Sequence, residues 1–148
     1  MKPVRPENKK IFIVNLLLAG LFGFFAWFQR NDIDPTIYSQ PSFDNPTLDS
    51  ALWFIFYFII AAGFIVVSFR KLPQWYFFIA IIACFFEMTM SGPGLWNNIF
   101  GDDSFNMAQT SMTAEDPRVE LTREFFGALL ALSAVFFQWW QSRSIKAD

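Results

Sequence analysis

The residues best suited to chemistry are a few charged and amide side chains at the ends of long apolar segments. Glu87 lies about one helical turn from the end of one segment, where a carboxylate in or near lipid requires a partner. Arg123 opens another segment at a similar depth, so we expect a Glu87–Arg123 ion pair that ties two helices together. A cation-binding or proton-linked site is the alternative. The predicted outer polar cluster consists of Asn31, Asp32, Asp34, Glu87, Arg123 and Glu124.

Other reactive arrangements are missing from the sequence. The chain has no histidine, which removes the commonest metal ligand and the commonest acid–base residue at neutral pH. Its lone cysteine, Cys84, cannot form an internal disulfide. No nucleophile–base set or phosphate-binding glycine loop is visible, and the spacing of Asp32 and Asp34 lacks the surrounding loop of a calcium site. We therefore expect a protein that is not an enzyme and has no cofactor.

Four apolar segments must position these residues. Residues 51–69 hold no charged side chain, and a helix of that length covers roughly 28 Å, close to the thickness of a bilayer's hydrocarbon core. Asp49 or Ser50 is expected to cap this helix, and a Ser-Gly-Pro-Gly sequence at residues 91–94 is expected to end the next one. The predicted helices span residues 11–28, 51–69, 75–90 and 118–140.

These segments predict one domain, residues 1–148, with an all-α fold. The protein is expected to be a polytopic membrane protein, an antiparallel four-helix transmembrane bundle with extended outer-side loops. Of the 11 lysines and arginines, only Arg30, Arg118 and Arg123 fall on the side of the longer loops. Positive-inside bias therefore predicts that both termini are cytoplasmic, with the bacterial inner membrane as the location. The first segment is interpreted as an uncleaved helix because it is longer than a signal-peptide core.

Small and amide side chains recur at helical spacing and predict the contact faces of the bundle. In lipid, helices associate by close packing and interhelical hydrogen bonds. Asn15 and Gln138 both lie near the inner face, and we expect them to bond to each other. A groove of small residues that admits a lipid or quinone tail is the alternative. The predicted packing residues are Asn15, Gly23, Gly127, Ala131 and Gln138.

Two segments resemble a known family. Residues 25–35, Phe-Ala-Trp-Phe-Gln-Arg-Asn-Asp-Ile-Asp-Pro, are similar to the Gln-x-Asn-Asp-Pro-Asp-Pro motif that ends helix one in the transmembrane-220 helix family of small four-span proteins. Residues 120–127, Glu-Leu-Thr-Arg-Glu-Phe-Phe-Gly, are similar to that family's Arg-Glu-x-x-Gly opening of helix four. Ile33 stands where the family usually has its first proline. The resemblance implies the four-span fold and implies no particular activity.

Three classes of function are compatible with these features. The first is a non-catalytic integral membrane subunit, or an assembly or stabilising factor, of a larger membrane protein complex, because the aromatic residues exceed what four helices can bury. The second is a small ion- or lipid-binding membrane carrier that uses the outer polar cluster. The third, a membrane enzyme, lacks a catalytic constellation. The expected partners are the lipid bilayer and other integral membrane subunits; the net charge of −2 gives no reason to expect nucleic acid.

Overall fold

The computed structural model describes residues 9–30, 45–112 and 115–144. These residues form four α-helices and one short 3₁₀ helix, η1. The α-helices are α1 (Lys9–Gln29), α2 (Pro46–Val67), α3 (Gln74–Phe100) and α4 (Arg118–Ser144), and η1 covers Gln109–Ser111. The prediction of an all-α fold is confirmed for the described part of the chain.

Three of the four helices are long and apolar enough to cross a membrane. They are α1, α2 and α3, with 21, 22 and 27 residues. α4 also has 27 residues, but it is not among the three, because charged and amide side chains lie in its first two and last two turns. A chain with several such helices is a membrane protein, and a lipid bilayer is its environment.

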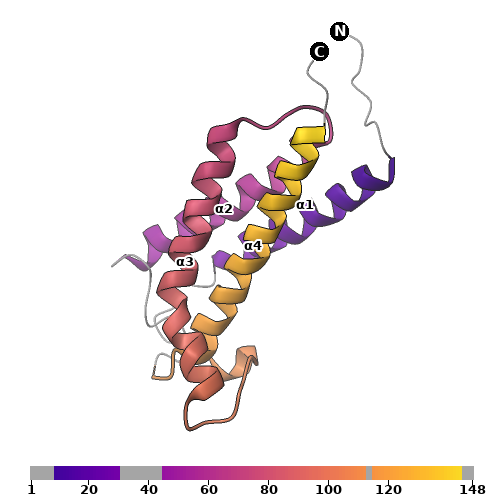
Figure 1. Ribbon diagram of the computed structural model, residues 1–148. Coiled ribbons are helices and arrows are strands. Elements are labelled where there is room, and N and C mark those ends of the chain that lie inside the picture. The colour runs from indigo at the N-terminus through magenta and orange to yellow at the C-terminus, as the bar shows by residue number, and fades with distance from the viewer. Residues whose placement is uncertain (1–8, 31–44, 113–114, 145–148) are drawn as a thin grey trace.

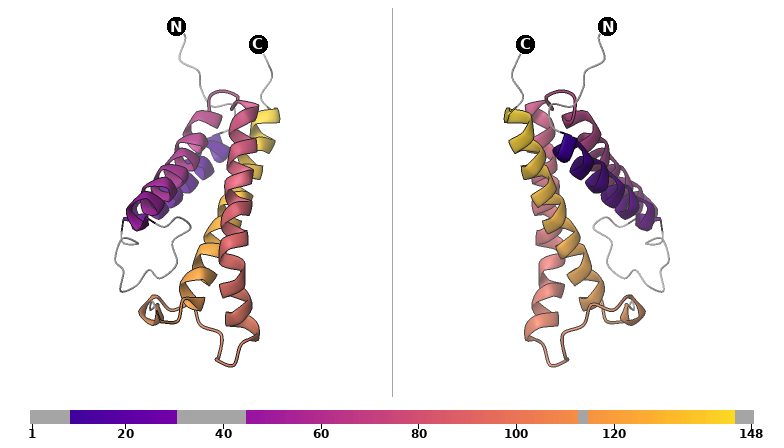
Figure 2. Two further views of the ribbon diagram at one scale, coloured as in Figure 1. Left: turned by 90° about the vertical axis from the view of Figure 1, so that its left-hand side faces the viewer. Right: turned by 90° about the vertical axis from the view of Figure 1, so that its right-hand side faces the viewer.

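The helices form two antiparallel hairpins (Figure 1). α1 packs mainly against α2, and α3 packs mainly against α4, while α2 and α4 join the hairpins. Figure 2 shows that the hairpins lie close together near the α2–α3 connection and diverge toward the opposite end. We call the end with the α2–α3 connection the closed end, and the opposite end, which holds η1, the open end.

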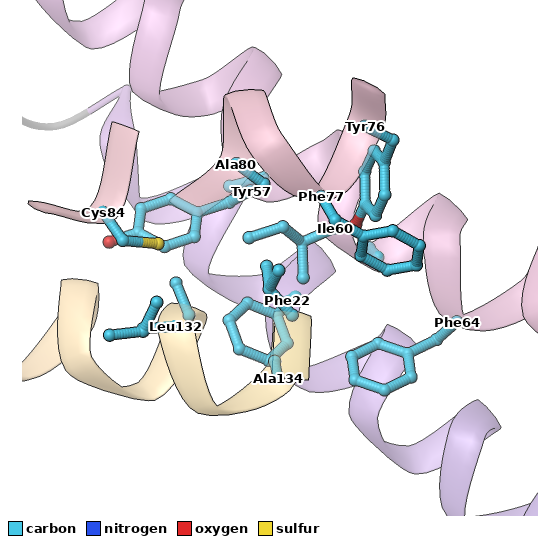
Figure 3. Close-up of a cluster of buried hydrophobic side chains, with 14 of the residues drawn as sticks. Phe22, Tyr57, Ile60, Phe64, Tyr76, Phe77, Ala80, Cys84, Leu132 and Ala134 are labelled. Atoms are coloured by element: carbon cyan, nitrogen blue, oxygen red, sulfur yellow. The ribbon is translucent and has the colours of Figure 1, made fainter. Parts of the chain in front are cut away.

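Aromatic and small side chains fill the space where the hairpins meet (Figure 3). Phe22 of α1 is buried and stacks against Tyr57 and Phe64 of α2, with ring centroids 6.3 and 6.0 Å apart. On the α4 side, the predicted packing residue Ala131 is fully buried beside Val135. Small side chains of this kind allow helices to approach closely, which is how helices associate in lipid.

Large apolar side chains cover the outside of the helices. Leu17 of α1 is 70% exposed, and Phe78 of α3 is 68% exposed. Soluble monomers rarely expose contiguous apolar patches larger than a few hundred Å². Acyl chains of the bilayer therefore account for this surface.

α2 begins earlier than the sequence predicts. Asn45 is its N-cap and accepts hydrogen bonds from two backbone N–H groups of the first turn, at 3.0 and 3.2 Å. Pro46 follows at the first helical position, where its missing N–H is harmless. Asp49 and Ser50, the predicted caps, lie buried inside the helix. The predicted cap is wrong because Pro46 opens the helix rather than belonging to the preceding loop.

α3 ends later than the sequence predicts, at Phe100 instead of Met90. Gly94 is buried, and a Cβ at that position would overlap Leu121 of α4, so the two helices approach closely there. Asn98 is fully buried, and its Nδ2 donates to the Thr122 hydroxyl of α4 at 2.9 Å. Packing against α4 thus overrides the local Gly-Pro-Gly signal. The predicted loop at residues 91–117 shortens to residues 101–117.

Buried amide side chains join the four helices at the closed end. The Nε2 of Gln138 in α4 donates to the carbonyl oxygen of Ile60 in α2 at 2.8 Å, and its Oε1 accepts from the hydroxyl of Tyr76 in α3. Asn15 of α1 exchanges two hydrogen bonds with Gln141 of α4, at 2.8 and 3.0 Å. The predicted bond between Asn15 and Gln138 is wrong. Gln141, one turn further along α4, is the partner of Asn15.

Two glycines differ in what surrounds them. A Cβ on Gly63 of α2 would lie 2.8 Å from the Tyr76 hydroxyl and 2.9 and 3.0 Å from the amide atoms of Gln138. Glycine at this position therefore lets these polar groups approach α2. Gly23 of α1, a predicted packing residue, has no atom within 4 Å of the place where a Cβ would stand. The prediction for Gly23 is wrong, because no other helix approaches α1 closely there.

Candidate functional site

A cavity of about 400 Å³ lies between the two hairpins in the half of the molecule toward the open end. All four helices and the α3–α4 connection contribute to its walls. The cavity exists because the hairpins diverge in this direction (Figure 2). Its volume falls within the range of small-molecule sites, about 300–1,000 Å³.

Aromatic side chains form the wall on the α1–α2 side. Phe24 and Phe28 lie one turn apart on α1, and Trp53 and Tyr57 lie one turn apart on α2. Phe25 meets Tyr57 edge to face, with ring centroids 5.9 Å apart. Such rings offer apolar contact area to an alkyl group, and their faces attract cations.

Carboxyl groups line the wall on the α3–α4 side. Glu87 comes from α3, and Glu120 and Glu124 come from α4. The four-residue spacing in α4 puts Glu120 and Glu124 on one face of that helix. Glu87 is 4% exposed, Glu120 is 3% exposed, and Glu124 is half-buried. Acidic residues buried this deeply are rare in membrane helices and mark candidate functional positions.

Arg123 is the basic residue among the described residues of the cavity wall. Its side chain is exposed, and its Nη1 donates to the carbonyl oxygen of Met107 in the α3–α4 connection at 3.2 Å. Met107 and Met112 of that connection also line the cavity. Arg123 therefore lies at the rim, where it fixes the connection over the site. Its ion pair with Glu87 stays a prediction.

Trp53 brings a buried hydrogen-bond donor to the cavity wall. Its side chain is 8% exposed, and its indole Nε1 has no hydrogen-bond acceptor among the described residues. Its place near the start of α2 favours an interfacial position, yet the ring is buried against Phe56 and Tyr57. A buried N–H without an acceptor is destabilising. An oxygen atom of a molecule in the cavity would remove that penalty.

Gly127 allows α4 to come close to the aromatic wall. A Cβ at Gly127 would stand 2.9 Å from the Tyr57 hydroxyl. The residue lies one turn after Arg123 and is one of the predicted packing residues. A larger side chain at Gly127 would push into Tyr57 and reduce the space between the hairpins.

Half of the predicted outer polar cluster meets at this cavity. Glu87, Arg123 and Glu124 come from different helices or turns and line the same space. Gln29, the last residue of α1, lines it as well. The cluster members that lie outside the described residues are Asn31, Asp32 and Asp34.

Glu120 and Trp53 are among the wall residues that the sequence pattern does not single out. Glu120 lies one turn before Glu124 and two turns before Gly127. This spacing is the signal that places Glu120 on the cavity face of α4. No comparable signal exists for Trp53. A tryptophan near a helix end is equally typical of an interfacial belt.

Within the described ranges, no group of three or more His, Cys, Asp or Glu side chains is arranged to hold a metal ion. Carboxyl groups spread around a cavity, opposite an aromatic wall, suit a larger organic ligand better than a bare ion.

One family of membrane proteins matches this chain along most of its length. The family is described as transmembrane family 220, helix, and its model matches residues 21–140. This range includes every residue of the cavity wall. No curated protein and no solved structure matches the chain. The chain therefore belongs to transmembrane family 220.

Proposed function

We propose that this protein binds a membrane lipid or a similar amphiphile in the cavity between its hairpins and has no catalytic role. The observation that carries the proposal is the combination of an aromatic wall and a carboxyl-lined wall around about 400 Å³. An amphiphile matches both walls, because its alkyl part contacts the rings while its head group contacts the carboxyl groups.

Exposed apolar residues at the cavity edge support entry from the bilayer. Phe24 and Phe28 of α1 and Leu130 of α4 line the cavity and are also exposed on the outside of the helices. An acyl chain lying on these side chains leaves its head group free to enter between the hairpins. The ligand would therefore move laterally from the lipid and not through water.

All four helices cross the bilayer in this proposal. The polar side chains that lower the hydropathy of α4 face the other helices rather than lipid: Glu120, Thr122, Gln138 and Gln141 are buried. The exposed side chains of α4 include Leu129, Leu130, Phe136 and Trp140. Composition alone therefore underrates α4 as a span, because lipid meets its apolar face.

The closed end faces the cytoplasm in this proposal, and both termini lie there, in the bacterial inner membrane. The bias of lysine and arginine supports this orientation. A green fluorescent protein fused after residue 148 is expected to fluoresce, whereas alkaline phosphatase at the same place is expected to be inactive. An insertion of each reporter between residues 102 and 103 should give the reverse. Activity of the phosphatase at the C-terminus would contradict the orientation.

Photocrosslinking tests lipid binding directly. A phospholipid with a photoactivatable group high on its acyl chain is expected to label cavity residues such as Phe126 and Leu130, and label there should be displaced by unlabelled lipid. Label on the lipid-facing residue Phe78 should not be displaced.

A glycine pair supplies the matched variants. Gly127→Leu fills space beside Tyr57 and is expected to abolish the displaceable label, whereas Gly23→Leu projects into open space and is expected to leave it unchanged. Equal, non-displaceable labelling of the cavity and of Phe78 would refute lipid binding.

A second candidate function is that of a subunit or assembly factor of a larger membrane complex. The observation that favours it is a group of exposed aromatic side chains at the open end. Trp96 and Phe100 of α3 touch, with ring centroids 4.5 Å apart, and Phe105 follows in the connection. Purification in mild detergent should then yield a particle that contains another integral membrane subunit, and Trp96→Ser with Phe100→Ser should release it. Recovery of the 17.2 kDa chain alone would count against this candidate.

A further inference from the structure

On the basis of the proposed lipid binding, we infer that the cavity selects a phospholipid whose head group carries a primary amine, of the phosphatidylethanolamine type. The inference depends on which polar groups line the cavity and where. Hydrogen-bond acceptors lie on the α3–α4 wall, and hydrogen-bond donors lie on α2 and at the rim. The ligand must present the complementary groups in the same arrangement.

The hydrogen-bond acceptors on the α3–α4 side of the cavity favour a ligand with a cationic donor. Among the described residues, the cavity wall carries three carboxyl groups, from Glu87, Glu120 and Glu124, and one guanidinium, from Arg123 at the rim. Hydrogen bonds between an ammonium group and a carboxylate are about twice as strong as neutral ones. A glycerol head group offers these carboxyl groups only neutral hydroxyl donors.

The cavity of about 400 Å³ has room for an organic cation. In the parts of the chain that the structure describes, no set of acidic, cysteine or histidine side chains is arranged to hold a metal ion. Trp53 and Tyr57 line the same cavity. Aromatic faces attract an ammonium group within about 6 Å, most strongly where water is excluded.

The donor groups point to an oxygen acceptor in the same ligand. Trp53 is more than nine-tenths buried in the cavity wall, and its Nε1 has no acceptor among the described residues. Arg123 adds a guanidinium, the side chain best suited to phosphate. A phosphodiester with its ester oxygens satisfies both donors. The ligand therefore carries an ammonium group and a phosphate together.

A primary amine fits better than a quaternary one. A primary ammonium has three N–H donors for the carboxyl groups of Glu87 and Glu120. A choline group has none and would rely on the aromatic wall alone. The geometry therefore ranks an ethanolamine head group above choline, and choline above glycerol.

Native mass spectrometry of the full chain in mild detergent tests this ranking. The probes are phosphatidylethanolamine, phosphatidylcholine and phosphatidylglycerol with identical acyl chains, and glycerophosphoethanolamine, which lacks them. We expect the dissociation constant for phosphatidylethanolamine to be at least about tenfold lower than that for phosphatidylglycerol, the change that one charge-assisted hydrogen bond gives. Equal affinity for the choline lipid overturns the primary-amine assignment. Equal affinity for glycerophosphoethanolamine overturns the assignment to a lipid.

Two conservative variants and one control connect the preference to this cavity. Glu87→Gln keeps the shape of the side chain and should remove most of the preference for ethanolamine over glycerol. Trp53→Phe keeps an aromatic ring and removes the N–H donor. It should raise the dissociation constant for each of the three lipids about fivefold, as the loss of one hydrogen bond does. Glu115 is an exposed acidic residue that does not line the cavity. Glu115→Gln should change neither the head-group preference nor the affinity for any of the three lipids.

The outcomes distinguish a failure of the head-group preference from a failure of lipid binding itself. Tight but equal binding of all three lipids, abolished by Gly127→Leu, would overturn the head-group inference and leave lipid binding standing. No saturable binding of any lipid would overturn lipid binding itself. An unchanged preference in Glu87→Gln would also overturn the inference, because it would place the selective contact elsewhere.

Discussion

Replacement of Gly63 by alanine tests how the closed end is held together. The new Cβ would lie 2.8–3.0 Å from the Tyr76 hydroxyl and from both amide atoms of Gln138. These groups must move, and the contacts from Gln138 to the Ile60 carbonyl and from Tyr76 to Gln138 must lengthen. Overpacking costs about 1–3 kcal/mol, and two interhelical hydrogen bonds in lipid contribute together about 1–3 kcal/mol. Alanine offsets about 1 kcal/mol through its higher helix propensity.

The expected net effect is a destabilisation of about 1–5 kcal/mol. Gly23→Ala is the matched control, because it makes the same chemical change in another apolar helix with no atom within 4 Å of the new Cβ. The control is expected to be neutral or stabilising by up to about 1 kcal/mol. The two glycine substitutions should therefore differ in sign. The free energy of unfolding is measured by titration with sodium dodecyl sulfate in mixed micelles, with helical circular dichroism as the signal.

A double-mutant cycle identifies the cause. Gln138→Ala removes both amide atoms that crowd Gly63, so Gly63→Ala should cost markedly less in that background, with a coupling energy above about 0.5 kcal/mol. If Gly63→Ala is as stable as the wild type, the close contact of α2 with Gln138 and Tyr76 is wrong. If the two substitutions are additive, the cost of Gly63→Ala comes from somewhere other than Gln138.

Two further substitutions compare a buried and a partly exposed contact at the open end. Asn98→Ala removes the bond to Thr122 and both bonds to the backbone of Asn106, and should destabilise by about 2–4 kcal/mol and speed proteolysis within residues 101–112. Unchanged stability and proteolysis would show that Asn98 does not anchor the connection. Arg118→Gln removes ion pairs with Asp116 at 2.7 Å and with Asp103 at 3.5 Å, whose side chains are 45% and 74% exposed. It should change stability by about 0–1 kcal/mol, an effect that disappears in high salt. A larger, salt-independent loss would place those pairs in a drier environment.

The apolar helices could be predicted from sequence because their signal is long and uniform. α1 runs from Lys9 to Gln29, close to its predicted range of 11–28, since a continuous apolar segment in lipid has only helix as a way to satisfy its backbone. The end of α3 could not be predicted in this way. Gly92, Pro93 and Gly94 are local breakers, and only the contact of Gly94 with Leu121 explains why the helix continues.

Hydrogen-bond partners on different helices were harder to predict than the end of the bundle at which each residue lies. The sequence places Asn15 and Gln138 near the same end, and both are indeed fully buried there. A difference of one turn on α4 decides whether Asn15 meets Gln138 or Gln141, and that register depends on the crossing of the hairpins. The same limit explains Gly23, which has the right spacing on α1 but faces no neighbouring helix.

The charged residues of the candidate site could be predicted from the sequence, but the shape of the cavity could not. Depth and charge bring Glu87, Arg123 and Glu124 to one end, and the structure places all three on one cavity. The cavity itself depends on the divergence of the hairpins, which no residue pattern encodes locally. Trp53 belongs to it for the same reason: its ring is turned inward by packing against Phe56 and Tyr57.

The two polar regions of the molecule differ in a way that separates structure from function. At the closed end the side chains are neutral amides, and Asn15, Gln138 and Gln141 each both donate and accept a hydrogen bond within the protein. Such mutual pairing is what a stable contact between helices in lipid requires. At the open end the groups are ionisable, they surround a space, and the one indole donor of the wall finds no acceptor in the described protein. In the proposed function, the ligand supplies the acceptor that this buried donor lacks among the described residues.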